Sequence, residues 1–97
     1  MATFITLSKF TEQGIRSIKE SPNRAEAFKE MAKKHGCTLK DIYWTQGQYD
    51  MIAIIESRDE MTANALLLSA AALGNLTTET LRAYSSAEMK TIIGKMG

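Results

Sequence analysis

Four short runs of the chain alternate apolar and polar residues, which is the pattern of β-strands. They span Thr3 to Lys9, Cys37 to Thr45, Tyr49 to Glu56 and Leu76 to Ser85, and they are rich in β-branched and aromatic residues. Two longer segments instead repeat apolar residues at intervals of three and four, the spacing of one face of a helix. The pattern therefore predicts four strands and two main helices.

The helices also have start and stop signals. Ser21 is the expected N-cap of the first helix, with Pro22 at its first position and Gly36 as its left-handed stop. Its predicted buried stripe is Ala25, Phe28, Met31, Ala32 and His35.

Ser57 and Glu60 have the spacing of a capping box that opens the second helix, which runs to about Leu73. Its predicted buried face is Met61, Ala65, Leu68 and Ala72. Ser85 and Glu88 repeat the same spacing and predict a short terminal helix through Ile93.

The order strand, helix, strand, strand, helix, strand is that of two split βαβ units. Right-handed crossovers place the first and third strands at the centre of a four-stranded antiparallel sheet, with both helices on one face. Gly47 lies in the short connection between the second and third strands, which predicts a tight hairpin there. The fold class is therefore α+β, ferredoxin-like βαββαβ, as one domain over residues 1–97.

Strand alternation divides the side chains between the two faces of this sheet. We assign an almost wholly apolar set to the helix-covered face: Ile5, Leu7, Ile42, Trp44, Met51, Ala53, Ile55, Leu81 and Ala83, with Tyr49 near the strand start. The other face then carries Phe4, Thr6, Ser8, Tyr43, Thr45, Asp50, Ile52, Ile54, Thr80, Arg82 and Tyr84. This second set is too apolar to remain in water, so we expect a homodimer packed sheet to sheet, with the polar members lining a cavity between the sheets.

Composition excludes several functions. Twelve basic and eleven acidic residues leave a net charge of +1, which gives no electrostatic footprint for nucleic acid or an anionic membrane. One cysteine and one histidine cannot form a zinc-type site within the chain, and the single cysteine fits a reducing compartment. No nucleotide-binding glycine motif or hydrolase nucleophile motif is present, so we expect no cofactor. No signal peptide or membrane span is evident, and a cytoplasmic protein is expected.

The hairpin motif Gly47-Gln48-Tyr49-Asp50, preceded by Tyr43-Trp44-Thr45, resembles the signature of the GYD-domain family. The upstream patterns Thr11-x-x-Gly14-Ile15 and Ser21-Pro22-x-Arg24 are also similar to that family, so the resemblance covers nearly the whole chain. It implies a ferredoxin-like fold of the dimeric α/β-barrel group and a family with little characterised biochemistry. The hairpin is also similar to that of effector-binding domains in Lrp/AsnC-type regulators, although this chain has no helix-turn-helix extension.

Five residues are candidate ligand-binding groups: Thr6, Tyr43, Asp50, Arg82 and Tyr84. An arginine and two phenols can hold a small molecule that carries a carboxylate, but the same groups can equally form a subunit-interface network. Asp50 either fixes the hairpin, by accepting amide hydrogen bonds or pairing with Arg82, or acts as a carboxylate in the intersheet cavity.

Three functions remain open. The first is a homodimeric module that binds a small organic ligand between its sheets. The second is a cofactor-independent enzyme, similar to the monooxygenases or isomerases that this fold hosts. The third is a structural partner subunit, in which another protein covers the open face of the sheet.

Overall fold

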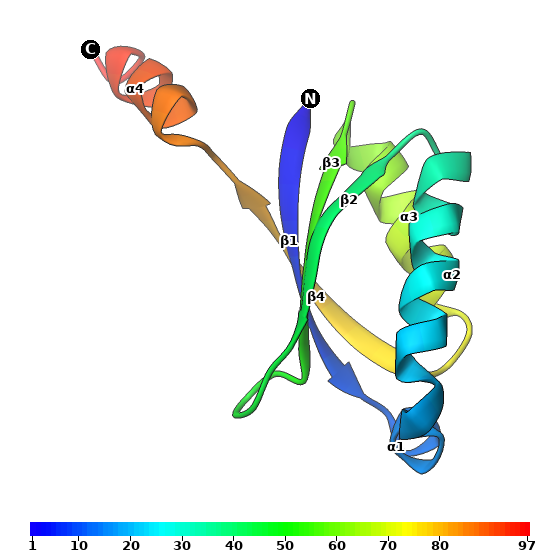
Figure 1. Ribbon diagram of the computed structural model, residues 1–97. Coiled ribbons are helices and arrows are strands. Elements are labelled where there is room, and N and C mark those ends of the chain that lie inside the picture. Colours follow the sequence, from blue (N-terminus) through cyan, green and yellow to red (C-terminus); the bar gives the residue numbers. More distant parts are fainter.

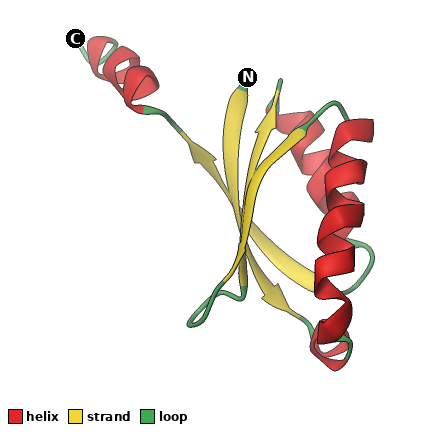
Figure 2. Ribbon diagram, in the orientation of Figure 1, coloured by secondary structure: helices red, strands yellow, loops and turns green.

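The computed structural model describes residues 1–97 and confirms the predicted antiparallel sheet, with strand order β2-β3-β1-β4. The strands are β1 (Ala2–Phe10), β2 (Thr38–Trp44), β3 (Met51–Ser57) and β4 (Leu76–Ala83); the helices are α1 (Glu12–Arg16), α2 (Ser21–Lys34), α3 (Glu60–Ala71) and α4 (Ser86–Gly94), with a 3-10 turn, η1 (Ile18–Glu20). Helices α2 and α3 cover one face of the sheet, whereas α4 stands away from it on the other side (Figures 1 and 2). The fold therefore has one helix layer and one sheet face without a helix against it.

The first long helix begins one residue earlier than the sequence predicts. Ser21 is not its N-cap but its first residue, and its hydroxyl accepts a 2.8 Å hydrogen bond from Trp44 Nε1 on β2. Glu20, at the end of η1, takes the N-cap position without a side-chain cap. A tertiary contact to β2 has replaced the local cap, because Ser21 is buried beneath Trp44 rather than exposed at a free helix end.

Helix α3 also differs from its prediction. Its N-cap is Asp59, whose Oδ1 accepts a 2.7 Å hydrogen bond from the Thr62 amide, and not Ser57, which lies in β3. The buried face is Ala63, Leu66 and Leu67 in place of the predicted Met61, Ala65, Leu68 and Ala72. Apolar residues occur on every side of this helix, so spacing alone could not select the face that packs on the sheet.

The face assignment is correct for β2 and β3 and wrong for β1 and β4. Phe4, Thr6 and Ser8 are buried and pair in register with Ile55, Ala53 and Met51, so they lie beneath the helices. Their β4 partners on the same face are Arg82, Thr80 and Thr78. The residues predicted to lie inside, namely Ile5, Leu7, Leu81 and Ala83, therefore point to the open side. In β1 and β4, residues with hydroxyl groups therefore occupy part of the helix-covered face, and aliphatic residues lie on the open face.

The core is small and lies toward one end of the layer between the helices and the sheet. Its fully apolar cluster is Ala32, Cys37, Ile55, Leu66 and Leu67, with Phe28, Met31 and Leu39 packed against it. Only 14 of the 97 residues are buried, so much of the apolar surface of this chain remains exposed. A domain with so little buried surface gains stability from any association that covers a second face.

The first turn of α1 depends on a glycine for a steric reason. A Cβ atom at Gly14 would lie 2.1 Å from the carbonyl oxygen of Asn75, at the start of β4. Thr11 holds the same junction together, since its hydroxyl donates to the carbonyl of Gly74 at 2.6 Å.

We predict that Gly14→Ala lowers the free energy of unfolding by about 1–3 kcal/mol, because the backbone of α1 or of residue 75 must move. Gly94→Ala is the matched control, since Gly94 also lies in a helix but has open space where a Cβ would be placed. Urea denaturation followed by circular dichroism measures both variants. Equal stability of the two variants would contradict the close packing of α1 against the start of β4.

Candidate functional site

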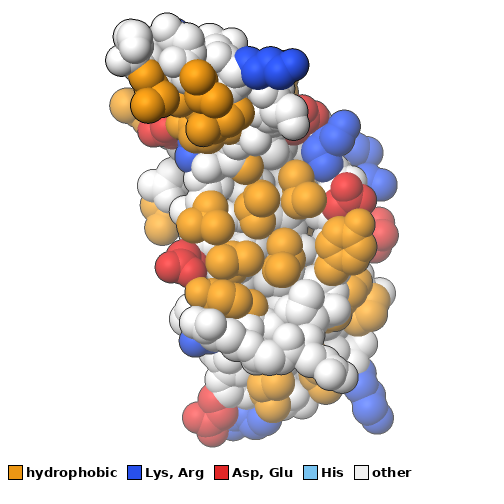
Figure 3. All heavy atoms as spheres, turned by 90° about the vertical axis from the view of Figure 1, so that its left-hand side faces the viewer, with side chains coloured by type: hydrophobic (Ala, Val, Ile, Leu, Met, Phe, Trp, Pro, Cys, Tyr) orange, Lys and Arg blue, Asp and Glu red, His pale blue; other side chains and the backbone are white.

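The open face of the sheet carries an apolar patch at its centre. Ile5 of β1 lies between Ile54 of β3 and Leu81 of β4, and Leu7 lies beside Ile52. Tyr43 of β2 extends the patch, and its side chain is 56% exposed. Figure 3 shows these hydrophobic side chains as a band across the sheet. We call this set the open-face patch: Ile5, Leu7, Tyr43, Ile52, Ile54 and Leu81. Contiguous apolar surface of this kind is typical of a protein-interaction site.

Polar groups border the patch at the hairpin end. Tyr49 donates a 2.6 Å hydrogen bond from its hydroxyl to Glu79, and Lys9 lies 5.6 Å from the centre of its ring. The hydrogen bond to Glu79 raises the pKa of the Tyr49 hydroxyl above its ordinary value. The prediction that Tyr49 faces the helices is therefore wrong, because Glu79 pairs with Leu7 on the open side.

Helix α4 adds a second exposed apolar surface on the same side of the molecule. Met89 and Ile93 of α4, and Met96 just beyond its end, are about half exposed or more, and the helix stands clear of the sheet (Figure 1). The predicted capping box is present, with the Ser85 hydroxyl accepting from the Glu88 amide and Glu88 accepting from the Ser85 amide. The capping box thus stabilises the start of α4, although no other part of the chain packs over this helix.

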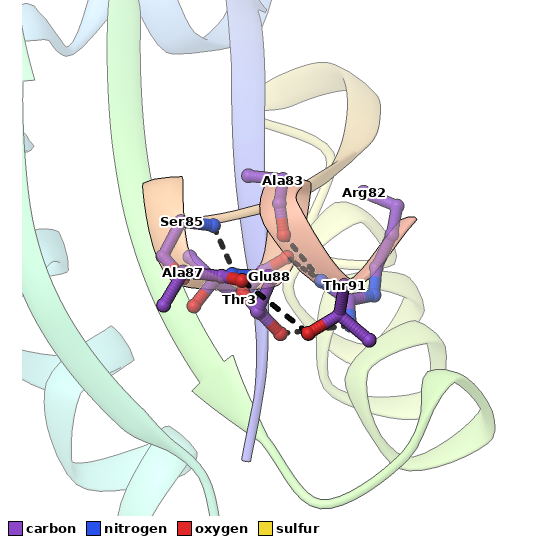
Figure 4. A network of polar contacts seen from close by, with 7 residues as sticks. All are labelled: Thr3, Arg82, Ala83, Ser85, Ala87, Glu88 and Thr91. Carbon is purple, nitrogen blue, oxygen red and sulfur yellow. Dashed lines mark hydrogen bonds and ion pairs between the residues drawn. The ribbon is translucent and has the colours of Figure 1, made fainter. Parts of the chain in front are cut away.

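Arg82 joins this helix to the sheet. Its Nη1 donates to the carbonyl oxygens of Thr3, at 3.2 Å, and of Ala83, and its Nη2 lies 3.8 Å from Glu88 (Figure 4). The guanidinium also lies 5.5 Å from the ring of Phe4 and 4.5 Å from that of Tyr84. The amide of Ser85, together with Arg82, holds the pKa of the Glu88 carboxyl below its usual value. Arg82 therefore fixes the junction between β1, β4 and α4.

Asp50 ties the β2–β3 hairpin to the central strand. Its Oδ2 accepts a 2.9 Å hydrogen bond from the Phe10 amide, and its own amide donates to the carbonyl of Ser8 at 2.8 Å. It makes no ion pair with Arg82, which was one of the two structural roles expected for it. Gly47 in the hairpin has a φ of 104°, so the turn uses the left-handed conformation that glycine favours.

The five predicted ligand groups do not come together. Thr6 faces the helices, Tyr43 lies on the open face, and Asp50 belongs to the hairpin. Only Arg82 and Tyr84 are in contact, at the base of α4. The polar set expected between two sheets is thus absent from the open face, because Thr6, Ser8, Thr80 and Arg82 lie in the helix-facing phase of their strands.

Sequence reasoning missed Ile5, Leu7 and Leu81 as members of the open-face patch. A signal for them existed in the charged residues of the same strands. Lys9 is in phase with Ile5 and Leu7, and Glu79 is in phase with Leu81. A charged residue is rarely buried without a partner, so these two positions indicate the solvent-facing side.

A separate cavity of about 120 Å³ lies between the sheet and the covering helices. Its wall includes Thr6 and Ser8 of β1, Ser21 and Arg24 of α2, and mostly apolar residues elsewhere. The buried Thr6 Oγ1 and Arg24 Nη1 have no hydrogen-bond partner. Arg24 belongs to the family-like pattern Ser21-Pro22-x-Arg24 but was not among the five predicted ligand groups, because its position beside a cavity is defined only in the folded chain. No group of three or more His, Cys, Asp and Glu side chains could hold a metal ion.

The comparisons with known proteins agree with this architecture. The family model for the GYD domain matches residues 4–93. This chain belongs to the GYD domain family. The expected resemblance is therefore confirmed, over nearly the whole sequence.

One relative is a Thermus thermophilus protein named glutamine synthetase and cystathionine beta-lyase binding protein. It is 31% identical over 90 residues, which are 92% of this chain and 95% of the relative. A crystal structure of a protein from Thermus thermophilus is similar at a TM-score of 0.58 and 22% identity, over 89% of this chain and 96% of that one.

A feast or famine regulatory protein from M. tuberculosis, solved in complex with L-methionine, has a TM-score of 0.66 at 13% identity. The match covers 89% of this chain and 54% of the regulator. At such identities both structural matches describe the fold alone. No helix of the GYD protein combines the length and the apolar character needed to cross a bilayer.

We predict that Asp50→Ala lowers the free energy of unfolding by about 1–2 kcal/mol, because the Phe10 amide loses its acceptor. Asp41→Ala is the control, since Asp41 lies in the neighbouring strand β2, is exposed and makes no ion pair. Equilibrium urea denaturation gives both values. Equal stability of the two variants would show that the hydrogen bond from the Phe10 amide to Asp50 does not stabilise the fold.

Proposed function

We propose that this GYD protein is a protein-binding module that buries the open-face patch against another folded protein. The observation that carries the proposal is the uninterrupted apolar centre of that face, where Ile5, Ile54 and Leu81 are cross-strand neighbours. Buried aliphatic and aromatic centres with a polar rim are the usual anatomy of protein interfaces. Here Tyr43 supplies an aromatic member, and Lys9, Tyr49 and Glu79 supply the rim.

The class of partner follows from the named relative. That protein's name states that it binds two enzymes, and it aligns with 92% of this chain. We propose that this chain likewise binds enzymes of amino-acid metabolism, with glutamine synthetase and cystathionine beta-lyase as the first to test. Helix α4 supports the same function, because its exposed Met89 and Ile93, with Met96 just beyond it, add apolar surface, and the helix lies on the side of the sheet that α2 and α3 leave open (Figure 1).

A second candidate is pairing of two copies through the same patch, as in a dimeric α/β barrel. Its specific support is the mixed charge of the rim, since Lys9 and Glu79 allow a two-fold related copy to meet opposite charges. A small-molecule space between paired sheets has less support, because Thr6 and Arg82 do not line the open face. Multi-angle light scattering separates the two: a monomer favours a foreign partner, and a dimer favours self-pairing.

We predict that Ile54→Lys weakens binding to glutamine synthetase or cystathionine beta-lyase of the same organism by about tenfold or more. A charged side chain at the centre of the patch would have to be desolvated without a partner. Biolayer interferometry with the immobilised full chain measures the dissociation constants.

Met61→Lys is the control for this experiment. Met61 is 87% exposed on α3, in the helix layer rather than on the open face, and we expect its replacement to change affinity by less than about twofold. Equal losses for the two variants would place the contact elsewhere than the open face. If the unaltered chain binds neither enzyme, the proposed partner class is wrong.

A further inference from the structure

The internal cavity combines apolar walls with polar groups that lack partners. Of its 18 lining residues, 12 are hydrophobic, and they come from the sheet, α2, α3 and the turn after α3. Phe28 and Met31 of α2, Met51 of β3 and Leu67 of α3 form much of the apolar wall. Ala53 and Ala70 supply short side chains, which leave open the space that longer residues would fill. Such a mixture is typical of small-molecule sites, where apolar walls surround a few polar anchors.

Two polar atoms at this wall are unsatisfied. Thr6 is 3% exposed, and its Oγ1 has no hydrogen-bond partner; the same is true of Nη1 of Arg24. Buried polar groups in folded proteins are almost always paired, so each orphan calls for an explanation. Thr6 and Arg24 both line this one cavity, with the two unpaired atoms closed off from its open space, so a small turn of either side chain would present a hydrogen-bond donor to a group bound there.

The charge of Arg24 specifies the chemistry of that partner. Arg24 is partly buried, with its Nη1 closed off from solvent; a guanidinium stays protonated in proteins, so an anion beside this nitrogen would be favourable. Arg24 takes part in none of the ion pairs of the structure; its Nη2 donates only to the neutral hydroxyl of Ser17. A carboxylate is the matching group, since it accepts from a guanidinium N–H and from a hydroxyl at once.

The size of the cavity limits the rest of the ligand. A dry cavity of about 150 Å³ is known to hold one benzene molecule. The space of about 120 Å³ is partly open to the outside, so it holds at least a carboxylate with a short aliphatic tail, roughly five to seven non-hydrogen atoms in all.

We propose that this cavity binds a short aliphatic monocarboxylate, with the carboxylate held by the side chains of Arg24 and Thr6 and the tail against Phe28, Met51 and Leu67. This site lies inside one chain, on the opposite face of β1 from the open-face patch. Its occupancy is therefore independent of the protein-binding function proposed above, and either can fail without the other.

The experiment uses isovalerate as the probe. Titration of the full chain, ¹⁵N- and methyl-labelled, follows chemical-shift changes at residues that border the cavity. We expect saturable binding with a dissociation constant on the order of 1 mM, as befits so small a ligand. The uncharged isostere isovaleramide should bind at least about tenfold more weakly, because it cannot neutralise the guanidinium.

The variants assign the anchor residues. Arg24→Met should weaken isovalerate binding by at least about tenfold, and Thr6→Val by about threefold or more. Arg16→Met is the matched control, because Arg16 is exposed on α1 and pairs with Glu12, and it should leave the affinity unchanged. Should Arg24→Met fail to fold, Arg24→Lys keeps the charge without the planar fork and should still weaken binding by about threefold.

Three results would overturn the proposal. One is the absence of saturable shifts at about 20 mM isovalerate, a concentration well above the expected dissociation constant; the cavity then holds water only. Another is equal affinity for isovalerate and isovaleramide, which would remove the role of the charge. The last is unchanged binding by well-folded Arg24 variants, which would place the carboxylate elsewhere.

Discussion

The position of β1 at the centre of the sheet is the constraint on which the other features depend. Its side chains alternate between two unlike environments, and backbone pairing on both edges passes that alternation to β3 and β4. With Thr6 and Ser8 turned toward the helices, Ile5 and Leu7 must face outward. One choice of phase thus produces both the open-face patch and the polar floor of the internal cavity. The two proposed sites are opposite faces of the same strand.

This arrangement leaves more apolar surface uncovered than the composition of the chain suggests. Hydroxyl groups and a cavity occupy part of the helix-covered face of the sheet. The apolar core is therefore a small cluster around Ile55 and Leu66. Aliphatic side chains that could have enlarged this core lie instead on the open face. Apolar surface on the open face contributes to stability only when another protein covers it and removes it from water. The proposed association would cover the sheet face that the single chain leaves open, in keeping with a binding module.

The hairpin motif has a structural role in this account. Gly47 permits the turn, and Asp50 fastens the hairpin to β1 through the Phe10 amide. Arg82 similarly fastens α4 to the sheet edge through backbone carbonyls and Glu88 (Figure 4). Asp50 and Arg82, two of the predicted ligand groups, thus fix the positions of the hairpin and of α4, which border the open face. In this chain the motif supplies a turn and an anchor for the sheet, and the surface proposed for binding lies beside it.

The sequence by itself determined the four strands, the helices α2, α3 and α4, the order of these elements, the strand order β2-β3-β1-β4 and the capping of α4, because these depend on local patterns and on the handedness of crossovers. Tertiary structure decided what local patterns leave ambiguous. In β1 both phases carry apolar residues, and in α3 every side does, so only packing against neighbours selected the buried positions. Ser21 became a partner of Trp44 rather than a cap for the same reason. The place of Arg24 beside a cavity, with one guanidinium nitrogen unpaired, is likewise a property of the folded chain, since it depends on which residues pack around that side chain.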